Sequence, residues 1–254
     1  MSFSKIGIIV QARMNSSRLP GKVLLPFYGE KNILQIIIDR LKLSKYQFPI
    51  VIATSNAVID DAIEALAKSE KVNCFRGDEE NVLNRFISCS KYYNFDKIIR
   101  VCADNPFVDI DFMDELIRKS SEIDFDYYSF LVNDNLPAIK SHWGIFTEFV
   151  SVKALEKVKT ITDEKIHHEH VTNYIYEHPM DFKVFWEKAP FMIYGITDVR
   201  FTIDTKEDFL QMAQLWSLLV ERGITANFRR ALEILNEFPD IKNSMLERIN
   251  FNTK

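Results

Sequence analysis

"IGIIVQARMNSSRLPGKVLLP", residues 6–26, decides the fold class because it joins a buried strand to a cationic loop. The apolar, β-branched run Ile6–Val10 predicts a strand that is covered on both faces. The loop that follows carries Arg13, Arg18 and Lys22 around a short polar turn. Three cations placed directly after a buried strand indicate a binding site for an anion.

The rest of the first half alternates strands with helices. "FPIVIATSN" contains a second strand at residues 50–53, and "NILQIIIDRLKLSK" before it has helical apolar spacing. "KVNCFRG" and "KIIRVCADNP" are further strands, and helical patterns separate them. Parallel strands need crossover connections, so this order predicts an α/β fold with a mostly parallel mixed sheet and helices on both faces.

The regular alternation of strands and helices ends after Asp124. "FDYYSF", "HWGIFTEFVS", "FKVFWEK" and "DVRFTID" are strand-like, and "VSVKALEKVK" and "IHHEHVTNYIYEH" between them are helix candidates. We expect these strands to extend the sheet and close a pocket over it. "DTKEDFLQMAQLWSLLVER" and "ANFRRALEILNEFPDIKNSMLERI" predict two closing helices at about 205–250. Because no linker or repeat interrupts the chain, we expect residues 1–254 to form a single domain with a variable region at about 125–195.

Composition limits the partners. Thirty-two Lys and Arg residues against 36 Asp and Glu give a net charge of -4, so no global field would attract nucleic acid or an acidic membrane. Cys74, Cys89 and Cys102 lack the spacing of a metal site and are expected to be reduced core thiols. There is neither a leader-like N-terminal pattern nor an apolar stretch of about 18 residues, so we expect a cytoplasmic protein.

The cationic loop has the chemistry of a polyphosphate site. In open α/β sheets ligands bind beyond the carboxyl ends of the strands. Residues 15–17 can expose backbone N–H groups and Gly21 permits close approach of the chain. The loop is neither a Walker loop, since Val23 stands where that motif needs a hydroxyl, nor the G-x-G-x-x-G dinucleotide motif. The alternative is a solvated basic turn.

The loop resembles the signature "ARxxSxRLPGKxL" of the sugar cytidylyltransferases, which include the CMP-Kdo and CMP-sialate synthetases. Within that family it is most similar to the branch of spore coat polysaccharide biosynthesis protein F, with "VQARMxSxRLPGKVL". The resemblance implies a nucleotide-diphospho-sugar transferase-like, Rossmann-like fold and binding of CTP. It matches Arg13 and Lys22 with residues that contact the triphosphate, and Ala12 with the backbone position beside the cytosine. Arg18, by its charge, and Ser17, by its place in the turn, are further candidate nucleotide contacts.

Two further stretches resemble the family's metal signatures. "VCADNPFVD" matches the first with Asp104, and "DVRFTIDTKEDF" matches the second with Asp204, so the resemblance implies that both carboxylates bind the catalytic Mg²⁺. Two carboxylates with several phosphate or water oxygens also suit Mg²⁺ chemically. The alternatives are that Asp104 caps a turn and that Asp204 caps the following helix.

A stretch between the loop and Asp104 completes the expected nucleotide site. "FRGDEENVLNRF" is similar to "RGsxxdVLxRy" of the spore coat branch, whose surroundings contact the base and ribose. This similarity makes Arg76, Asn81, Val82 and Arg85 candidate nucleotide contacts.

The acceptor side shows mixed resemblance. "SHWGIF" is similar to the "HxGIY" element of CMP-Kdo synthetases, which makes His142 a candidate, and "GIFTEFVSVKALEK" retains Glu148 of the spore coat branch but has Phe146 where that branch has aspartate. "IHHEHVTNYIYEHP" is similar to "REHVTpyiy" and supplies Glu169 and His170. The histidines of this stretch lack the spaced partners of a zinc site.

The sequence thus predicts a Mg²⁺-dependent enzyme that transfers CMP from CTP to a sugar or sugar-acid acceptor and releases pyrophosphate, in surface polysaccharide or glycan biosynthesis. The resemblance further implies a homodimer formed through residues 125–195, and no contact with nucleic acid or membrane is expected. One alternative is a GT-A type glycosyltransferase, for which Asp109-Ile110-Asp111 is the candidate metal motif. The other is a nucleotide-binding module without turnover.

Overall fold

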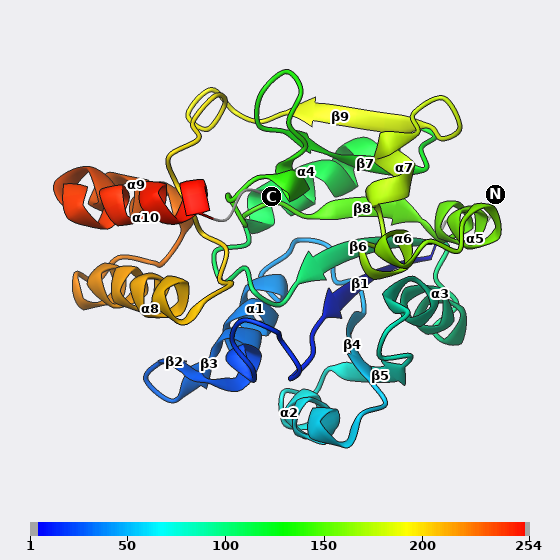
Figure 1. Cartoon of the computed structure of the whole chain (residues 1–254), viewed down its shortest axis with the longest axis horizontal. Helices are drawn as coiled ribbons and strands as arrows, with labels where there is room; N and C mark the ends of the chain where they lie inside the picture. The colour runs from blue at the N-terminus through cyan, green and yellow to red at the C-terminus, as the bar shows by residue number, and fades with distance from the viewer. Residues whose placement is uncertain (1–4, 252–254) are drawn as a thin grey trace.

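The computed structural model describes residues 5–251 and centres on a seven-stranded mixed sheet (Figure 1). The strand order is β5-β4-β1-β6-β8-β7-β9. Strands β1, β4, β5 and β6 run parallel, β8 is antiparallel to both of its neighbours, and β9 pairs in parallel with β7. The strands are β1 (Ile6–Gln11), β4 (Ile50–Ser55), β5 (Asn73–Gly77), β6 (Lys97–Cys102), β7 (Tyr127–Leu131), β8 (Glu148–Ser151) and β9 (Val184–Lys188), and β2 (Pro26–Tyr28) and β3 (Lys31–Asn32) form a separate hairpin.

Both faces of the sheet are buried, as the apolar runs predict. Side chains alternate across a strand, so Ile8 and Val10 of β1 pack into one core while Ile9 between them packs into the other. All three are at most 1% exposed. The predicted mostly parallel α/β sheet is confirmed.

Helices cover the two faces (Figure 1). The core on one side contains residues of α1, α2, α4, α8, α9 and α10, and the core on the other side contains residues of α3, α5 and α7. Their bounds are α1 (Ile33–Leu41), α2 (Asp61–Ser69), α3 (Val82–Tyr92), α4 (Ile110–Ser120), α5 (Val152–Ile161), α6 (Lys165–Glu169), α7 (Asn173–Glu177), α8 (Lys206–Glu221), α9 (Phe228–Glu237) and α10 (Pro239–Phe251).

The second half departs from the expected elements in several places. Residues 199–204 do not form the expected strand, and their N–H groups bond to two different segments: that of Phe201 donates to the His142 carbonyl and that of Ile203 to the Asp104 carbonyl. The helix expected from "IHHEHVTNYIYEH" is two short helices, α6 and α7. The last expected helix is interrupted before Pro239, which has no N–H to continue the hydrogen-bonding ladder and instead begins α10.

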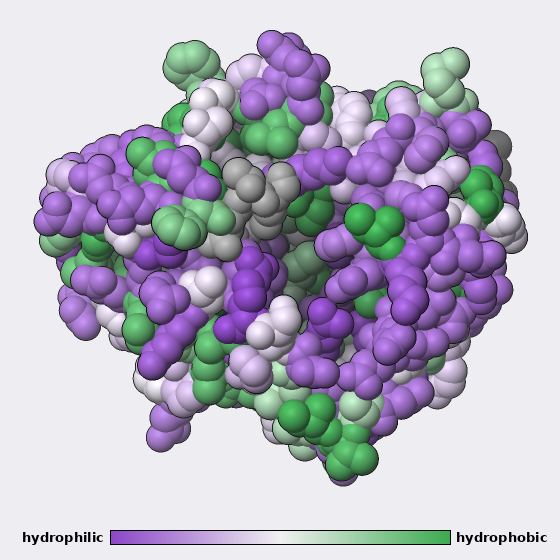
Figure 2. Space-filling view, viewed as in Figure 1, coloured by the Kyte–Doolittle hydropathy of each residue, from purple (hydrophilic) through white to green (hydrophobic). Residues whose placement is uncertain are grey.

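The face seen in Figure 2 is mainly hydrophilic, and its hydrophobic side chains are scattered over it. In residues 5–251 no helix is both long and apolar enough to cross a bilayer. All three cysteines are free, and burial raises the pKa of Cys89 to about 12. Thiols with such a raised pKa stay protonated, in keeping with the expectation of reduced cysteines.

Candidate functional site

Residues 12–21 leave the end of β1 as a compact loop. The N–H of Ala12 donates to the Ala53 carbonyl of β4 at 3.3 Å, and the Met14 carbonyl accepts from the N–H of Gly21 at 2.7 Å. Gly21 has φ +73°, a left-handed conformation that is costly for a residue with a side chain. The loop then enters the short 3₁₀ helix η1 (Lys22–Leu24), in which Lys22 is buried.

Asp60, which no sequence motif marks, holds this loop through hydrogen bonds. Its side chain is 1% exposed, Oδ1 accepts the Met14 N–H at 2.7 Å, and Oδ2 accepts the Ser55 N–H at 3.0 Å and the Ser55 hydroxyl at 2.5 Å. Burial alone would raise the pKa of Asp60, but these hydrogen bonds outweigh burial and hold the pKa below its ordinary value. The anionic form is therefore the one that the fold stabilises.

Two predicted metal carboxylates lie at the same edge of the sheet as the loop. Asp104 follows β6, and its carbonyl accepts the N–H of Ile203, so the chain segments that carry Asp104 and Asp204 are hydrogen-bonded side by side. The Lys22 ammonium bridges them, because Nζ lies 3.1 Å from Asp104 Oδ2 and 2.5 Å from the Ile203 carbonyl oxygen. Figure 1 shows the neighbouring ends of β1 and β6 from which these groups extend.

The remaining loop cations also contact carboxylates. Arg18 lies 2.7 Å from Asp204 Oδ1, and Arg13 lies 3.6 Å from Glu169 Oε1. The side chain of Arg18 is 49% exposed whereas that of Asp204 is 10% exposed, so the cation approaches a fixed carboxylate from solvent. The structure thus brings Arg18 and Lys22 together with the two aspartates, whereas Arg13 pairs with Glu169, and the roles of all these residues stay predictions.

The donor set suits Mg²⁺ in kind. Asp104 and Asp204 supply hard carboxylate oxygens, and Mg²⁺ is usually held by one or two carboxylates together with phosphate and water oxygens. Within residues 5–251 no group of three or more His, Cys, Asp or Glu side chains is placed to hold a metal ion. The two carboxylates by themselves fit an Mg²⁺ ion that takes its other ligands from phosphate and water oxygens.

A cavity of about 560 Å³ opens beside the two carboxylates. Asn105 and Thr202 line it next to them, and the Asn105 Oδ1 and Thr202 Oγ1 atoms are buried without a hydrogen-bond partner among the described residues. Gly144 packs against both with φ +58°, and a Cβ there would lie 2.9 Å from each side chain. The wall is completed by Arg18, Arg100, Cys102, Asp104, Ala138, Ile139, Lys140, Ser141, Phe146, Ile166, His170, Thr172, Asn173, Tyr176, Glu177 and Asp204.

The candidate nucleotide contacts next to α3 differ in their surroundings. Arg76 pairs with Asp61 and Glu64 of α2, Asn81 accepts the Asn84 N–H as the N-cap of α3, and Val82 is buried. The guanidinium group of Arg76 is thus already paired with carboxylates of α2. On the loop, Ser17 is exposed and Ala12 is buried.

Arg85 is the unusual member of this set. It is fully buried, its Nη1 donates to the Asp78 carbonyl at 3.0 Å, and its Nε and Nη2 have no hydrogen-bond partner among the described residues. Burial lowers the pKa of Arg85, and the positive charge of Arg13 lowers it further. A buried cation without a carboxylate partner is costly, which makes its two unused nitrogens candidate donors to a ligand.

The acceptor-side candidates occupy different positions. Glu148 is 3% exposed and pairs with Arg100, and its Oε1 accepts from the hydroxyls of Tyr127 and Thr172, each at 2.7 Å. Its ion pair lies at the base of the 560 Å³ cavity, which Arg100 lines. Burial lowers the pKa of Arg100, but Cys102 and Glu148 outweigh burial and raise the pKa above its ordinary value.

The histidines divide between this cavity and structural contacts. His170 is exposed and lines the cavity, whereas His142 interacts through Nδ1 with Arg200. His167 pairs with Asn173, and His168 lies 2.9 Å from Asn81 Nδ2. Glu169 is exposed and pairs with Arg13, so it lies at the loop rather than in the cavity wall.

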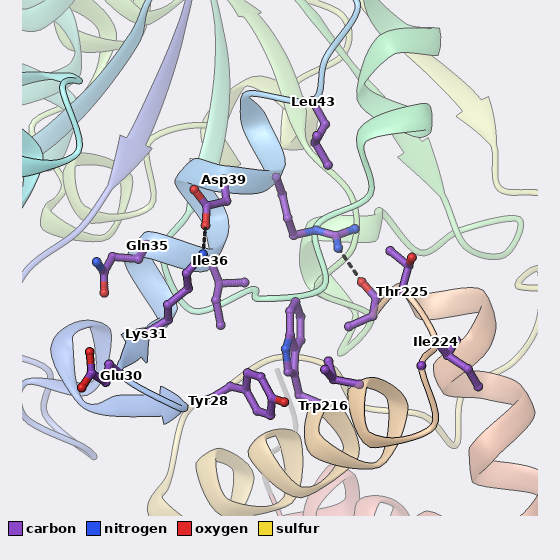
Figure 3. A pocket seen from close by; sticks show the side chains of 14 residues that line it. Tyr28, Glu30, Lys31, Gln35, Ile36, Asp39, Leu43, Trp216, Ile224 and Thr225 are labelled. Carbon is purple, nitrogen blue, oxygen red and sulfur yellow. Dashed lines mark hydrogen bonds and ion pairs between the residues drawn. The ribbon is translucent and has the colours of Figure 1, made fainter.

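A larger cavity of about 1090 Å³ lies elsewhere, between α1, the β2–β3 hairpin and the end of α8 (Figure 3). Three of its charged groups are already engaged: Lys31 pairs with Asp39 at 2.6 Å, and Arg40 donates to the Ala226 and Val108 carbonyls, both at 2.7 Å. None of the sequence-predicted site residues lines it. We therefore place the chemistry in the smaller cavity, where carboxylates and loop cations meet.

Comparison with known proteins identifies the family of the chain. A family model described as Cytidylyltransferase matches residues 7–244. The chain is 39% identical over 242 residues to the uncharacterized protein MJ1063 of Methanocaldococcus jannaschii, covering 94% of this chain and 93% of that protein. It is 35% identical over 240 residues to the spore coat polysaccharide biosynthesis protein SpsF of Bacillus subtilis, covering 91% and 94%. A solved cytidylyltransferase from Leptospira borgpetersenii superposes with a TM-score of 0.82 at 29% identity, covering 94% and 96%. This chain belongs to the cytidylyltransferase family.

Proposed function

We propose that this nucleotidyltransferase transfers CMP from CTP to a hydroxyl of a sugar or sugar-acid acceptor, depends on Mg²⁺, and releases pyrophosphate. The observation that carries the proposal is the meeting of Lys22 and Arg18 with Asp104 and Asp204 at one edge of the sheet. The name of the B. subtilis relative supports a place in surface polysaccharide or glycan biosynthesis.

The loop cations can neutralise the negative charge of the nucleotide. CTP carries about four negative charges, which repel an attacking oxygen until they are neutralised. Arg13, Arg18 and Lys22 would hold the triphosphate, and Lys22 is the best placed because it is buried and held by Asp104 and the Ile203 carbonyl. Asp104 and Asp204 would hold Mg²⁺, which supplies charge neutralisation at the phosphates and lowers the pKa of a coordinated hydroxyl.

The step needs no covalent enzyme intermediate. The acceptor hydroxyl oxygen forms a bond to the α-phosphorus, the bond from that phosphorus to the β-phosphate oxygen breaks, and pyrophosphate leaves with the electron pair. The hydroxyl proton passes to solvent. This chain's residues contribute by holding the reacting groups in line and by neutralising charge.

The cavity next to Asp104 and Asp204 is where we place the acceptor. His170 and Lys140 line its outer wall, and Asn105 and Thr202 line its inner wall. Lys140 pairs with Glu177 at 2.7 Å, so the positive charge available for an anionic acceptor is modest. Neutral hydroxyl-bearing groups and carboxylates both fit this lining.

The first aspartate of Asp109-Ile110-Asp111, the metal motif of the glycosyltransferase alternative, has a structural role instead. Asp109 is 3% exposed, its Oδ1 accepts the Phe112 N–H at 3.0 Å as the N-cap of α4, and its Oδ2 pairs with Arg229 at 3.2 Å. Burial raises the pKa of Asp109 even though these partners oppose the shift. This aspartate is thus occupied in capping a helix and does not line the cavity.

A homodimer and a cytoplasmic location belong to the same proposal. Met180, Phe185, Phe191 and Met192 are exposed hydrophobic side chains, and all lie within residues 125–195, where the sequence placed the subunit contact. Exposed aromatic and methionine side chains are enriched at interfaces. Light scattering should give twice the monomer mass, and F191S with M192S should lower it.

The test is pyrophosphate release from CTP, UTP, ATP and GTP against a panel of sugars, sugar acids and sugar phosphates. We expect release with CTP and Mg²⁺ for at least one acceptor, and a loss of about a hundredfold or more in D104N and D204N. D198N is the matched control, because Asp198 is a nearby aspartate whose ion-pair partner is Lys242 of α10, at 2.8 Å, and not a loop cation. Release of a nucleoside diphosphate from a donor sugar would support the glycosyltransferase instead. CTP binding without product, unchanged in D104N, would support the module without turnover.

A further inference from the structure

Behind Asp204 lies a buried ion-pair group to which neither the sequence reading nor the proposed chemistry gives a role, although Arg200 and Asp208 lie within the stretch "DVRFTIDTKEDF". Arg200 is 1% exposed, and its Nη2 donates to Asp204 Oδ2 at 2.7 Å. The same guanidinium donates from Nε to Asp208 Oδ1 at 2.8 Å and from Nη2 to Asp208 Oδ2 at 3.0 Å. One planar cation thus joins two carboxylates, and such fork contacts fix orientation as well as distance.

Asp208 is the centre of this group. Its Oδ2 also accepts the backbone N–H groups of Asp204 and Thr205, both at 3.0 Å, and it forms the capping box of α8 with Thr205. Burial alone would raise the pKa of Asp208, but the Arg200 guanidinium and these N–H groups outweigh burial and lower the pKa. Asp208 therefore holds Asp204 by its backbone directly and by its side chain through Arg200.

The last helix of the described chain also takes part. Arg248 of α10 forms an ion pair with Asp208, with Nε 2.9 Å from Oδ1. Two cations, Arg200 and Arg248, thus balance the two carboxylates Asp204 and Asp208, while Arg18 reaches Asp204 Oδ1 from the cavity side. The result is that Oδ2 of Asp204 is engaged inside the protein and Oδ1 faces the predicted phosphate-binding loop.

We propose that Arg200, Asp208 and Arg248 are positioning residues that fix the Asp204 carboxylate for a divalent cation, an inference that rests on the proposed function. Partners behind a metal ligand orient the ligand and tune its basicity, and their loss typically costs about 10–100-fold in metal affinity or activity. A purely structural ion-pair group would affect stability and leave metal affinity unchanged. The two interpretations are separated by measuring both quantities in the same variant.

R248Q is the informative variant, because Asp208 keeps Arg200 and its two N–H donors and the fold is expected to survive. K242Q is the matched control: Lys242 is another cation of α10, and it pairs with Asp198 at 2.8 Å without touching Asp208. Mn²⁺ binding is measured by electron paramagnetic resonance on the full chain with α,β-methylene-CTP, and urea unfolding is measured on the same samples. R200K, which keeps the charge but loses the fork, is the second variant.

We expect Mn²⁺ affinity to fall about tenfold in R248Q and further in R200K, with K242Q like the unaltered protein. We expect kcat for pyrophosphate release to fall in the same order while the KM for CTP changes little. Mn²⁺ affinity in R248Q equal to that of the unaltered protein, or an equal fall in K242Q, would overturn the proposal while leaving the proposed function intact. Absence of Mn²⁺ binding in the unaltered protein would overturn both.

Discussion

Asp60 provides the sharpest test of how the cationic loop is held. In D60N the carboxylate is replaced by an amide of nearly the same shape. Asp60 accepts hydrogen bonds from the Met14 N–H on one oxygen and from Ser55 on the other. The asparagine side chain has only one oxygen, so its NH₂ group must face either the Met14 N–H or Ser55.

The expected cost follows from those contacts. Hydrogen bonds to a charged group contribute about 1.5–3 kcal/mol, and a buried donor left without an acceptor costs about 1–3 kcal/mol. Because the amide retains one acceptor, we expect D60N to lower the free energy of unfolding by about 2–4 kcal/mol. Loosening of the loop that carries Arg13 and Arg18 should also weaken CTP binding about tenfold, which corresponds to about 1.4 kcal/mol.

The pH dependence carries a further signature. The pKa of Asp60 is lower in the folded state than its ordinary value of about 3.9, so its contribution is present above pH ~4 and is lost as the pH falls through the folded pKa. The unaltered protein should therefore lose stability more steeply than D60N between about pH 4 and pH 2. Urea unfolding at a series of pH values measures this difference.

D61N is the control, since Asp61 is adjacent, has a side chain that is 61% exposed and forms an ion pair with Arg76. Exposed pairs contribute about 0–1 kcal/mol, so D61N should unfold within that range of the unaltered protein. Calorimetric titration with CTP gives the affinities. Equal urea midpoints for D60N and D61N, or CTP affinity unchanged in D60N, would refute the anchoring role.

Three other variants test neighbouring contacts. G144A should lower the free energy of unfolding by about 1–3 kcal/mol more than G223A does, because both glycines have positive φ but only Gly144 has close neighbours; equal losses by urea unfolding would contradict this. R85M should leave stability unchanged or raise it by about 1 kcal/mol while weakening CTP binding at least about tenfold, since it removes the buried cation with two unused nitrogens; calorimetry showing normal CTP affinity would exclude a nucleotide contact. E148Q should cost about 3–5 kcal/mol because it leaves Arg100 buried without its counter-charge, and a urea midpoint like that of the unaltered protein would argue against that ion pair.

The parallel half of the fold could be read from the sequence because its signals are local. Ile6–Val10 and residues 50–53 are short β-branched runs that are buried on both faces in the structure, and helical patterns lie between them. The antiparallel half was harder to predict from the sequence. The strand expected from residue 142 begins only at Glu148, because Gly144 turns the chain with φ +58°.

The candidate site divides in the same way. The loop and Asp104 could be grouped because motif spacing marks them and the ends of β1 and β6 meet at one edge of a parallel sheet. Asp204 reaches the same place on a segment that forms no strand, so only its motif marked it. Asp60, Arg200 and Asp208 were missed, since each acts through partners that a helical or strand pattern does not reveal. Asp208 reads from the sequence as an ordinary capping residue of a helix, and only the fold shows what else it holds.

The hydrogen bond from Ile203 to the Asp104 carbonyl has a consequence for how such proteins can diversify. The chain leaves the proposed metal site after Asp104 and returns to it at Ile203. The two ends of this long excursion, residues 104 and 203, are therefore hydrogen-bonded to each other. Insertions or deletions in surface loops of the excursion cost little entropy and leave its two ends in register. Under the proposed function, chimaeras that exchange residues 125–195 between relatives should change the acceptor and leave nucleotide binding unaltered.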